Sequence, residues 1–254
     1  SSIVPKELLP INGKTNLEHI LDECIEAGIK EFIFIISKKK ESIKKYFFND
    51  HFYKSILAKK KDKRIKQYYQ KLKKYQKMIK FVYQNKPKGT GDAILKSQKL
   101  IKGSHFLMLF PDDLIIKKNC SKEMILLHKK TKGSIIATKT VDKKTVSRWG
   151  ILDPKNKKKK YFLINDVVEK PSIYHAPSNY AIIGRYILPK IIMSKLKKLK
   201  PGKGGEIHIT DAIKELINDG EKFYGNIFKG KYLDCGTLSG YINSTLEISK
   251  ENKK

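Results

Sequence analysis

The chain has 254 residues, 40% of them hydrophobic, so it can bury a substantial core in one large domain or two small ones. Its three cysteines, Cys24, Cys120 and Cys235, are widely spaced, which excludes a zinc motif or disulfide framework and favours a reducing, cytoplasmic setting. No apolar run approaches the roughly 18–20 residues that a membrane-spanning helix needs.

The formal net charge of +30 has two interpretations. Such an excess is typical of proteins that bind nucleic acid. Here, however, it is almost entirely lysine, spread along the chain beside many Ile, Asn and Tyr, as a compositional bias at permissive surface positions would produce. We favour this compositional bias over a specific nucleic-acid function. The positive electrostatic field would still attract polyanions, including nucleoside triphosphates, to a cleft.

The first elements in chain order are a loop, a helix and a strand. Two prolines in V-P-K-E-L-L-P-I (4–11) prevent a continuous helix, and Asn12-Gly13 predicts a turn. Asn16 is predicted to cap a helix over about 17–27, which Gly28 ends. The apolar run 32–36 then predicts a buried strand.

The stretch 38–80 carries seventeen Lys or Arg against three acids, interleaved with aromatic residues. One interpretation is a basic, aromatic nucleic-acid surface. The other is one or two long amphipathic helices whose aromatic residues face the core or a subunit partner. We favour the helices, because apolar and aromatic residues recur near helical spacing at Ile56, Ile65, Tyr68, Tyr69, Leu72 and Tyr75.

A glycine-containing turn follows a short predicted strand at 81–83 and precedes a helix that runs to about residue 100. In Q-N-K-P-K-G-T-G-D-A (84–93), Gly89 and Gly91 would expose backbone N–H groups and a helix N-terminus, which suits a phosphate or a base edge. Gln84 can both donate and accept, as reading a base edge requires. The turn is neither a Walker loop nor the Rossmann fingerprint, and similar turns are common in α/β folds.

The stretch H-F-L-M-L-F-P-D-D (105–113) reads as a buried strand of a parallel or mixed sheet followed by two carboxylates. Ligands of open α/β sheets bind just beyond the carboxyl ends of strands, which favours a functional role for Asp112 and Asp113. The alternative is an ordinary acidic turn.

The remaining pattern alternates strands and helices, which predicts an α/β domain with a β-rich insertion. Hairpin strands at 148–152 and 161–170 flank the lysine-rich turn 155–160. The other predicted elements are a helix at 121–130, strands at 134–138 and 181–187, a helix at 189–199, a glycine-rich loop at 201–205, a helix from Thr210 or Asp211, strands at 224–228 and 231–233, and a final helix after the turn 234–237.

Two more strand ends carry polar groups. Glu169-Lys170 places an acceptor and a cation side by side, which suits a sugar phosphate, or else forms an exposed ion pair. Asp234 follows an apolar pair, and if it faces Asp112 the two carboxylates could bind Mg²⁺. Lys6 could add charge near the same phosphates, but it is one of many lysines.

Taken in order, nine segments resemble the bacterial UTP–glucose-1-phosphate uridylyltransferases (UDP-glucose pyrophosphorylases), a branch of the sugar-nucleotide pyrophosphorylases. They span nearly the whole chain: P-K-E-L-L-P-I, E-C-I-E-A-G-I, Q-N-K-P-K-G-T-G-D-A, F-P-D-D, W-G-I-L-D, V-V-E-K-P, A-P-S-N-Y-A-I-I-G-R-Y, G-G-E-I-H-I-T-D-A-I and D-C-G-T. The resemblance implies a Rossmann-like nucleotidyltransferase fold over residues 1–254 as a single domain. Its mixed, mostly parallel central sheet would be flanked by helices and carry a small β-rich insertion.

The reaction implied by the resemblance is UTP plus glucose 1-phosphate giving UDP-glucose and pyrophosphate, with Mg²⁺. The enzyme would be a homo-oligomer, dimer or tetramer, acting without a membrane or a specific nucleic acid. Alternatives are another sugar-1-phosphate nucleotidyltransferase, for example a thymidylyltransferase, and a non-catalytic, basic polyanion-binding relative.

By motif, the resemblance assigns Lys6, Asp112 and Lys170 to catalysis. Asp112 and Asp234 would hold the metal, which leaves Asp113 solvent-facing or supporting. The implied substrate-binding residues are Gln84 and Gly89 for the uracil, and Gly150, Glu169, Asn179, Gly184 and Glu206 for the sugar.

The sequence also departs from this family. The G-x-G-T-R loop that grips the triphosphate, with the strand before it, is expected immediately before Ser1 and is absent from the sequence. We therefore predict that this polypeptide is N-terminally truncated, with low or no activity in isolation. Asp92 and His208 stand where His and Gln are expected, which leaves details of the base and sugar pockets open.

Overall fold

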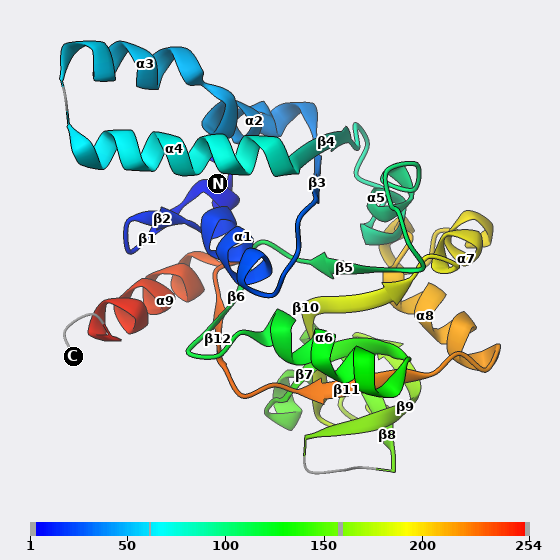
Figure 1. Cartoon of the computed structure of the whole chain (residues 1–254). Helices are drawn as coiled ribbons and strands as arrows, with labels where there is room; N and C mark the ends of the chain where they lie inside the picture. The colour runs from blue at the N-terminus through cyan, green and yellow to red at the C-terminus, as the bar shows by residue number, and fades with distance from the viewer. Residues whose placement is uncertain (1–3, 61, 157–159, 252–254) are drawn as a thin grey trace.

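The computed structural model describes residues 4–60, 62–156 and 160–251. They form a mixed α/β structure in which a six-stranded sheet is covered by helices and a separate strand pair lies under a group of helices (Figure 1). No helix in these ranges is both long and apolar enough to cross a membrane. The three cysteines are buried and unpaired.

The chain begins with the short 3₁₀ turn η1 (Lys6–Leu8) and the hairpin β1 (Pro10–Ile11) and β2 (Lys14–Thr15). Asn12 and Gly13 connect the two strands with φ of 51° and 75°, as a mirror-image hairpin turn requires. The turn predicted at these two residues is therefore confirmed.

Helix α1 (Asn16–Glu26) is capped by Thr15, so the predicted cap at Asn16 is wrong. The Thr15 hydroxyl accepts from the Glu18 backbone N–H, and the Glu18 carboxylate accepts from the Thr15 N–H at 2.9 Å. This capping box requires an acidic residue three positions after the cap, and only Thr15 satisfies that spacing. Gly28, with φ of 92°, follows the helix as predicted.

The six-stranded sheet determines where most of the predicted site residues lie. Its spatial order is β5 (His105–Leu109), β10 (Tyr180–Pro189), β7 (Ser134–Thr140), β11 (Phe223–Ile227), β9 (Tyr161–Glu169) and β8 (Gly150–Lys155). Only β7 and β11 pair in parallel; the other pairings, including β8 with β10, are antiparallel. The α/β class and the mixed sheet are confirmed, but within this sheet the predicted parallel majority is wrong. After the β8–β9 hairpin, β10 runs between β5 and β7 in the opposite direction to both.

Two further strand pairs lie outside this sheet. Strands β3 (Phe32–Ile36) and β4 (Ile79–Tyr83) pair in parallel, and β6 (Asp113–Ile116) and β12 (Lys231–Asp234) pair antiparallel. Strand β5 lies at an edge and is only partly buried, so the predicted fully buried strand is corrected. A cavity of about 930 Å³ lies between β3 and β5, and its lining extends to Gln84, Thr90 and Pro111.

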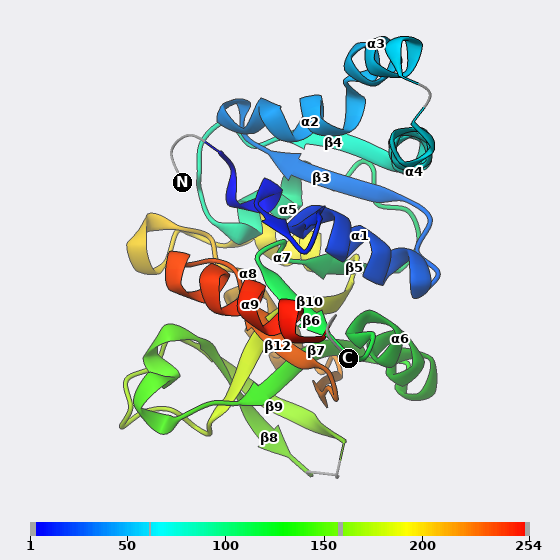
Figure 2. The same ribbon diagram turned by 90° about the vertical axis from the view of Figure 1, so that its left-hand side faces the viewer.

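The basic stretch forms three helices rather than one or two: α2 (Glu41–Phe48), α3 (Asp50–Lys59) and α4 (Lys63–Met78). They gather at one end of the molecule, above β3 and β4 (Figure 2). Phe47 and Tyr75 are buried in one apolar cluster with residues of α1 and β3. The preferred interpretation, helices whose aromatic residues face the core, is confirmed for these two, whereas Phe52 is exposed.

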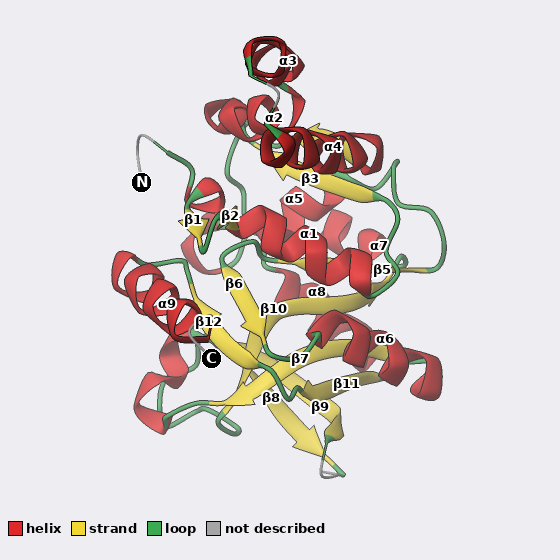
Figure 3. Cartoon of the chain, turned by 60° about the vertical axis from the view of Figure 1, so that its left-hand side comes forward, coloured by secondary structure: helices red, strands yellow, loops and turns green. Residues whose placement is uncertain are grey.

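Helices cover both faces of the six-stranded sheet (Figure 3). On one face, α5 (Thr90–Lys96), α7 (Ile192–Lys198) and α8 (Ile209–Asn218) contribute to a core that includes Ile136. On the other face, α6 (Cys120–Thr131) packs with Ile135 and Ala137. This alternation along β7 follows from the two-residue period of a strand. Helix α9 (Leu238–Glu251) ends the described chain, and part of the predicted lysine-rich turn, 157–159, lies outside the described residues.

Candidate active site

The two carboxylates after β5 point to different surroundings. Asp113 accepts hydrogen bonds from the Gly184 backbone N–H at 2.9 Å and from the Tyr232 hydroxyl at 2.6 Å. Burial raises the pKa of Asp113, against these hydrogen bonds. A Cβ atom at Gly184 would lie 2.4 Å from Asp113 Oδ2, so only glycine permits this approach. Of the two roles expected for Asp113, the structure favours support over a solvent-facing position.

Asp112 and Asp234 face one small space. An ideal Cβ on Gly236 would lie 2.9 Å from Asp112 Oδ2 and 3.1 Å from Asp234 Oδ1, so the absence of a side chain there leaves room between the two carboxylates. Lys6 forms an ion pair with Asp112 Oδ2. Although burial opposes it, the hydrogen bond to Asp112, with the charges of Asp112, Glu7 and Asp234, raises the pKa of Lys6.

This donor set fits Mg²⁺. Magnesium is bound in proteins by one or two carboxylates, with water and substrate phosphates completing its octahedron. In the part of the chain that the structure describes, no group of three or more His, Cys, Asp or Glu side chains could hold a metal ion. Two carboxylates beside an open space therefore match an ion that also needs oxygens from a substrate.

A second polar group lies at the end of β9. It consists of the side chains of Glu169, Lys170 and Thr210, with Gly150 beside them. Glu169 Oε2 accepts from the Thr210 hydroxyl at 3.0 Å, and Lys170 Nζ lies 3.8 Å from Glu169 Oε1. Gly150 is the register partner of Glu169, and a Cβ there would lie 3.3 Å from Glu169 Oε2. Lys170, with φ of 45°, donates its backbone N–H to Trp149. Glu169 therefore lies against a glycine that has no side chain to cover it, with an ammonium beside it.

The glycine-containing turn that precedes α5 is held against the segment before α8. The Gln84 side-chain amide donates to the Gly89 carbonyl at 3.1 Å and to Asp92 Oδ2 at 2.8 Å. Ile207 accepts from the Gly91 N–H and donates to the Lys88 carbonyl. A Cβ on Gly89, whose φ is 96°, would lie 2.6 Å from the Ile207 carbonyl oxygen and 3.0 Å from Glu206 Cβ.

The start of α8 connects these groups. The Ile209 N–H donates to the Thr90 hydroxyl at 3.3 Å, and Thr210, the next residue, donates to Glu169. The segment 206–210 therefore touches both the predicted base-reading turn and the predicted sugar-binding group. The cavity beside β5 extends from Gln84 and Thr90 to Pro111, which precedes Asp112.

Two residues that are predicted to bind the sugar, Gly184 and Asn179, have different environments. Gly184 lies against Asp113, as described above. The Asn179 amide N–H donates to the Val141 carbonyl at 3.1 Å, while Asn179 accepts from the Val141 N–H through its own carbonyl. The side-chain oxygen and the second amide N–H of Asn179 are therefore the groups that it could offer to a ligand.

Two basic residues near this site were not predicted from the sequence. Arg185 is fully buried and donates to the carbonyl oxygens of Phe110 and Asp113, on either side of Asp112. Lys139 lies over the Tyr232 ring, 4.5 Å from its centroid. Burial lowers the pKa of Lys139, opposed by the nearby charges of Asp113 and Asp234. An arginine within an apolar strand was a usable signal for Arg185, whereas nothing distinguished Lys139 among 55 basic residues.

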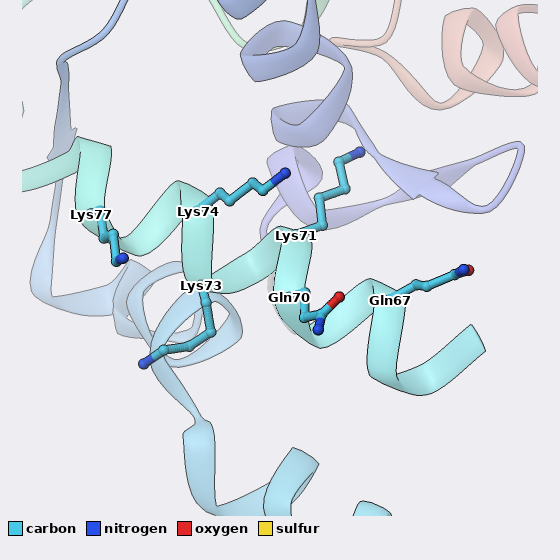
Figure 4. Close-up of a pocket in the computed structure, with 6 residues that line it drawn as sticks. All are labelled: Gln67, Gln70, Lys71, Lys73, Lys74 and Lys77. Carbon is cyan, nitrogen blue, oxygen red and sulfur yellow. The ribbon is translucent and has the colours of Figure 1, made fainter. Parts of the chain in front are cut away.

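A depression of about 430 Å³ on α4 is lined by lysines and glutamines of that helix alone (Figure 4). Lys71 and Lys73 on this helix form ion pairs with Asp22 and Asp50, so part of the basic stretch neutralises local acids. The depression contains none of the predicted site residues.

Comparison with known proteins gives a consistent result. A family model described as nucleotidyl transferase matches residues 1–251. The chain is 34% identical to the UTP–glucose-1-phosphate uridylyltransferase of Bacillus subtilis, covering 99% of this chain and 86% of that protein. It is also 34% identical to the enzyme of the same name from Mycoplasma pneumoniae, covering 96% and 84%.

Solved structures similar to this chain include several UDP-glucose pyrophosphorylases. An apo UDP-glucose pyrophosphorylase is similar with a TM-score of 0.87 and 34% identity, covering 98% of this chain and 92% of that one. A UDP-glucose pyrophosphorylase in complex with UDP-glucose has a TM-score of 0.84 and 32% identity, covering 98% and 91%. A UTP-bound enzyme from Acinetobacter baumannii has a TM-score of 0.81 and 26% identity, covering 98% and 87%.

Proposed function

Because this chain belongs to the nucleotidyl transferase family, among the UTP–glucose-1-phosphate uridylyltransferases, we propose that it makes UDP-glucose and pyrophosphate from UTP and glucose 1-phosphate. One structural observation supports the proposal most. The turn that carries Gln84 and the group around Glu169 share the segment 206–210, through the contacts of Ile207 with Lys88 and Gly91 and of Thr210 with Glu169. A base-reading turn and a sugar-binding group connected in this way would suit the two halves of a sugar nucleotide.

The reaction requires positioning more than acid–base chemistry. A phosphate oxygen of glucose 1-phosphate attacks the α-phosphorus of UTP and forms the new P–O bond. The bond from that phosphorus to the oxygen bridging the α- and β-phosphates breaks in line, and pyrophosphate leaves with the electron pair. Since the attacking oxygen is already anionic, no proton has to be removed from it.

The chain's own residues would supply orientation and charge. Glu169, held by the Thr210 hydroxyl, would accept hydrogen bonds from sugar hydroxyls beside Gly150, and Lys170 would neutralise the sugar phosphate. Lys6 would place its ammonium at the triphosphate, since it already lies at Asp112. Asp112 and Asp234 would hold Mg²⁺, which supplies charge stabilisation at the phosphates when bound. Gly184, Asn179 and Glu206 would border the sugar.

The test is release of pyrophosphate from UTP, glucose 1-phosphate and Mg²⁺, with UDP-glucose identified by mass spectrometry. Replacing UTP by dTTP, and the sugar by other sugar 1-phosphates, separates this function from related nucleotidyl transfers. The polyanion-binding alternative predicts oligonucleotide binding that weakens steeply with salt, and no pyrophosphate. Absence of sugar nucleotide with every pair of substrates, in the full-length gene product, would refute the proposal.

Three further expectations accompany this proposal, on domain organisation, oligomeric state and cellular location. Residues 1–254 would form one nucleotidyltransferase domain, supported by a family match over 1–251. The chain would assemble as a dimer or tetramer, which light scattering would test. It would act in the cytoplasm, where its three unpaired cysteines would stay reduced.

A further inference from the structure

We propose that Asp92 selects the base, by fixing the Gln84 amide so that only its oxygen can face the nucleotide. This inference rests on the function proposed above. The fixed orientation of the Gln84 amide makes the site specific for uracil and thymine, the pyrimidines that carry N–H at ring position 3, and unfavourable for cytosine. Asp92 is then a positioning residue that acts through Gln84.

Hydrogen bonds within the chain fix the orientation of the Gln84 side-chain amide. A primary amide has two N–H donors and one carbonyl acceptor. Gln84 Nε2 donates to the Gly89 carbonyl oxygen at 3.1 Å and to Asp92 Oδ2 at 2.8 Å. Both donors are therefore used within the chain, and Oε1 is the polar atom left for a ligand.

The opposite orientation of this amide is unfavourable. Turned by 180°, Gln84 would direct Oε1 at the Gly89 carbonyl and at the Asp92 carboxylate. Both of these groups are acceptors, so no hydrogen bond could form. Asp92 is only 8% exposed, and water cannot readily compensate for two facing acceptors there.

The Asp92 carboxylate is itself held in place. It lies in the first turn of α5, directly after Gly91, whose N–H donates to the Ile207 carbonyl. Its other oxygen, Oδ1, lies 3.4 Å from Lys96 Nζ one turn further on. The carboxylate therefore has one oxygen at a lysine and one at Gln84.

The consequence for the base follows from its edge. Uracil and thymine carry N–H at position 3 and can donate to Gln84 Oε1, whereas cytosine has a bare nitrogen there. Cytosine would place an acceptor against an acceptor, and sites that leave buried polar groups unpaired reject such ligands strongly.

The experiment uses the full-length gene product, as in the test of the proposed function. It measures dissociation constants of UTP and CTP by calorimetry, and kcat/KM for both nucleotides with glucose 1-phosphate. Wild type is expected to bind UTP at least 100-fold more tightly than CTP. Asp92→Ala frees the Gln84 amide to rotate, so this ratio should fall at least tenfold, through weaker UTP binding and unchanged or tighter CTP binding. The Asn of Asp92→Asn can pair with either amide orientation, so its ratio should lie between the two.

Two further variants isolate the route through Gln84. In a Gln84→Ala background, Asp92→Ala should no longer alter the UTP-to-CTP ratio. Lys99→Met, at an exposed position just after α5, is the control and should leave the ratio within about twofold. If Asp92 had a purely structural role in α5, Asp92→Ala would weaken the binding of UTP and CTP equally.

The outcomes separate this inference from the proposed function. Equal loss of UTP and CTP binding in Asp92→Ala, or a wild type that does not discriminate between them, would overturn the inference. Preferential UTP binding that depends on Asp92, without any UDP-glucose formed, would support the inference in its binding form and refute the proposed reaction. If Asp92→Ala does not fold, the Asp92→Asn ratio decides, and an unchanged value counts against the inference.

Discussion

Arg185 and Glu23, which are 162 positions apart in the sequence, form a buried ion pair with a separation of 3.0 Å. The Arg185 side chain is fully buried, and that of Glu23 is 8% exposed. The same guanidinium donates to the carbonyl oxygens of Phe110 and Asp113. Because these residues flank Pro111 and Asp112, the pair connects α1 and β10 to the backbone that carries a proposed metal ligand.

Arg185→Met should lower the free energy of unfolding by about 3–5 kcal/mol, because it leaves the Glu23 carboxylate buried without its cationic partner. It should also reduce turnover more than stability alone explains, since the backbone on both sides of Asp112 loses a donor. Urea denaturation and kcat measured well below the unfolding transition would show the two effects.

A double variant distinguishes a broken pair from general damage. Arg185→Met combined with Glu23→Leu removes both charges, so its stability should recover much of the loss. Arg148→Met is the matched control, because Arg148 is exposed on η3 (Lys143–Arg148), and it should change stability by less than about 0.5 kcal/mol. A loss of under 1 kcal/mol in Arg185→Met would contradict this account.

Asp112→Asn should lower Mg²⁺-dependent kcat by about 10²–10³-fold while leaving the fold intact. The change removes one of two carboxylates that face the space beside Gly236, and it also removes the anionic partner of Lys6. Steady-state kinetics across a Mg²⁺ titration and a circular-dichroism melt test the two parts. Asp153→Asn, on β8, is a control that should retain activity. Wild-type turnover in Asp112→Asn would place the metal elsewhere.

Thr210→Val should raise KM for glucose 1-phosphate about tenfold and leave KM for UTP nearly unchanged. Valine keeps the shape of threonine but cannot donate to Glu169 Oε2, so the carboxylate loses the hydrogen bond that orients it. Thr145→Val, on η3, is the control, because it likewise removes a hydroxyl that donates one hydrogen bond, here to the exposed Asp142 carbonyl. An equal rise in both KM values would indicate that the start of α8 had moved instead.

Much of the fold could be predicted from local patterns. Helix α1, strands β3 and β7 and the β8–β9 hairpin are near their predicted positions, because hydrophobic periodicity and turn residues specify them locally. Strand β6 was missed because its four residues follow Asp112 directly and pair with β12, more than a hundred positions later. Strand direction within the sheet was also wrong, since it depends on where β10 inserts between β5 and β7.

Sequence patterns proposed candidate site residues, but they did not predict which side chains contact one another. Strand ends and motifs pointed to Asp112, Asp234 and Glu169. The partners that hold them are distant in the sequence: Arg185 at the F-P-D-D backbone and Thr210 at Glu169. Even Asp92, eight residues from Gln84, appeared only as a departure from the family pattern, because the sequence does not show where an amide points.

Asp22 links α1 to α4, and this predicts a pH dependence of stability. Its carboxylate accepts from Lys14 at 2.8 Å, Lys71 at 2.9 Å and the Tyr75 hydroxyl at 2.5 Å. Partial burial opposes ionisation, but the hydrogen bonds from these three residues outweigh it and hold the pKa of Asp22 below its usual value of 3.8. Since the folded-state pKa is lowered, the stabilisation is present above pH 3.8 and is lost as pH falls through the folded-state value.

Asp22→Asn should therefore lower stability at pH 7 by about 1 kcal/mol, a small value because the Asp22 side chain is 34% exposed and solvent screens its ion pairs. The difference in Tm between wild type and variant should be constant from pH 7 to about pH 5 and should shrink below pH 4, as wild-type Asp22 takes up a proton. Thermal melts of both proteins over this range give the measurement. Asp219→Asn, which removes the exposed partner of Lys195, serves as the control for loss of one surface charge. A difference that grows on acidification would mean that Asp22 destabilises the folded state in its charged form.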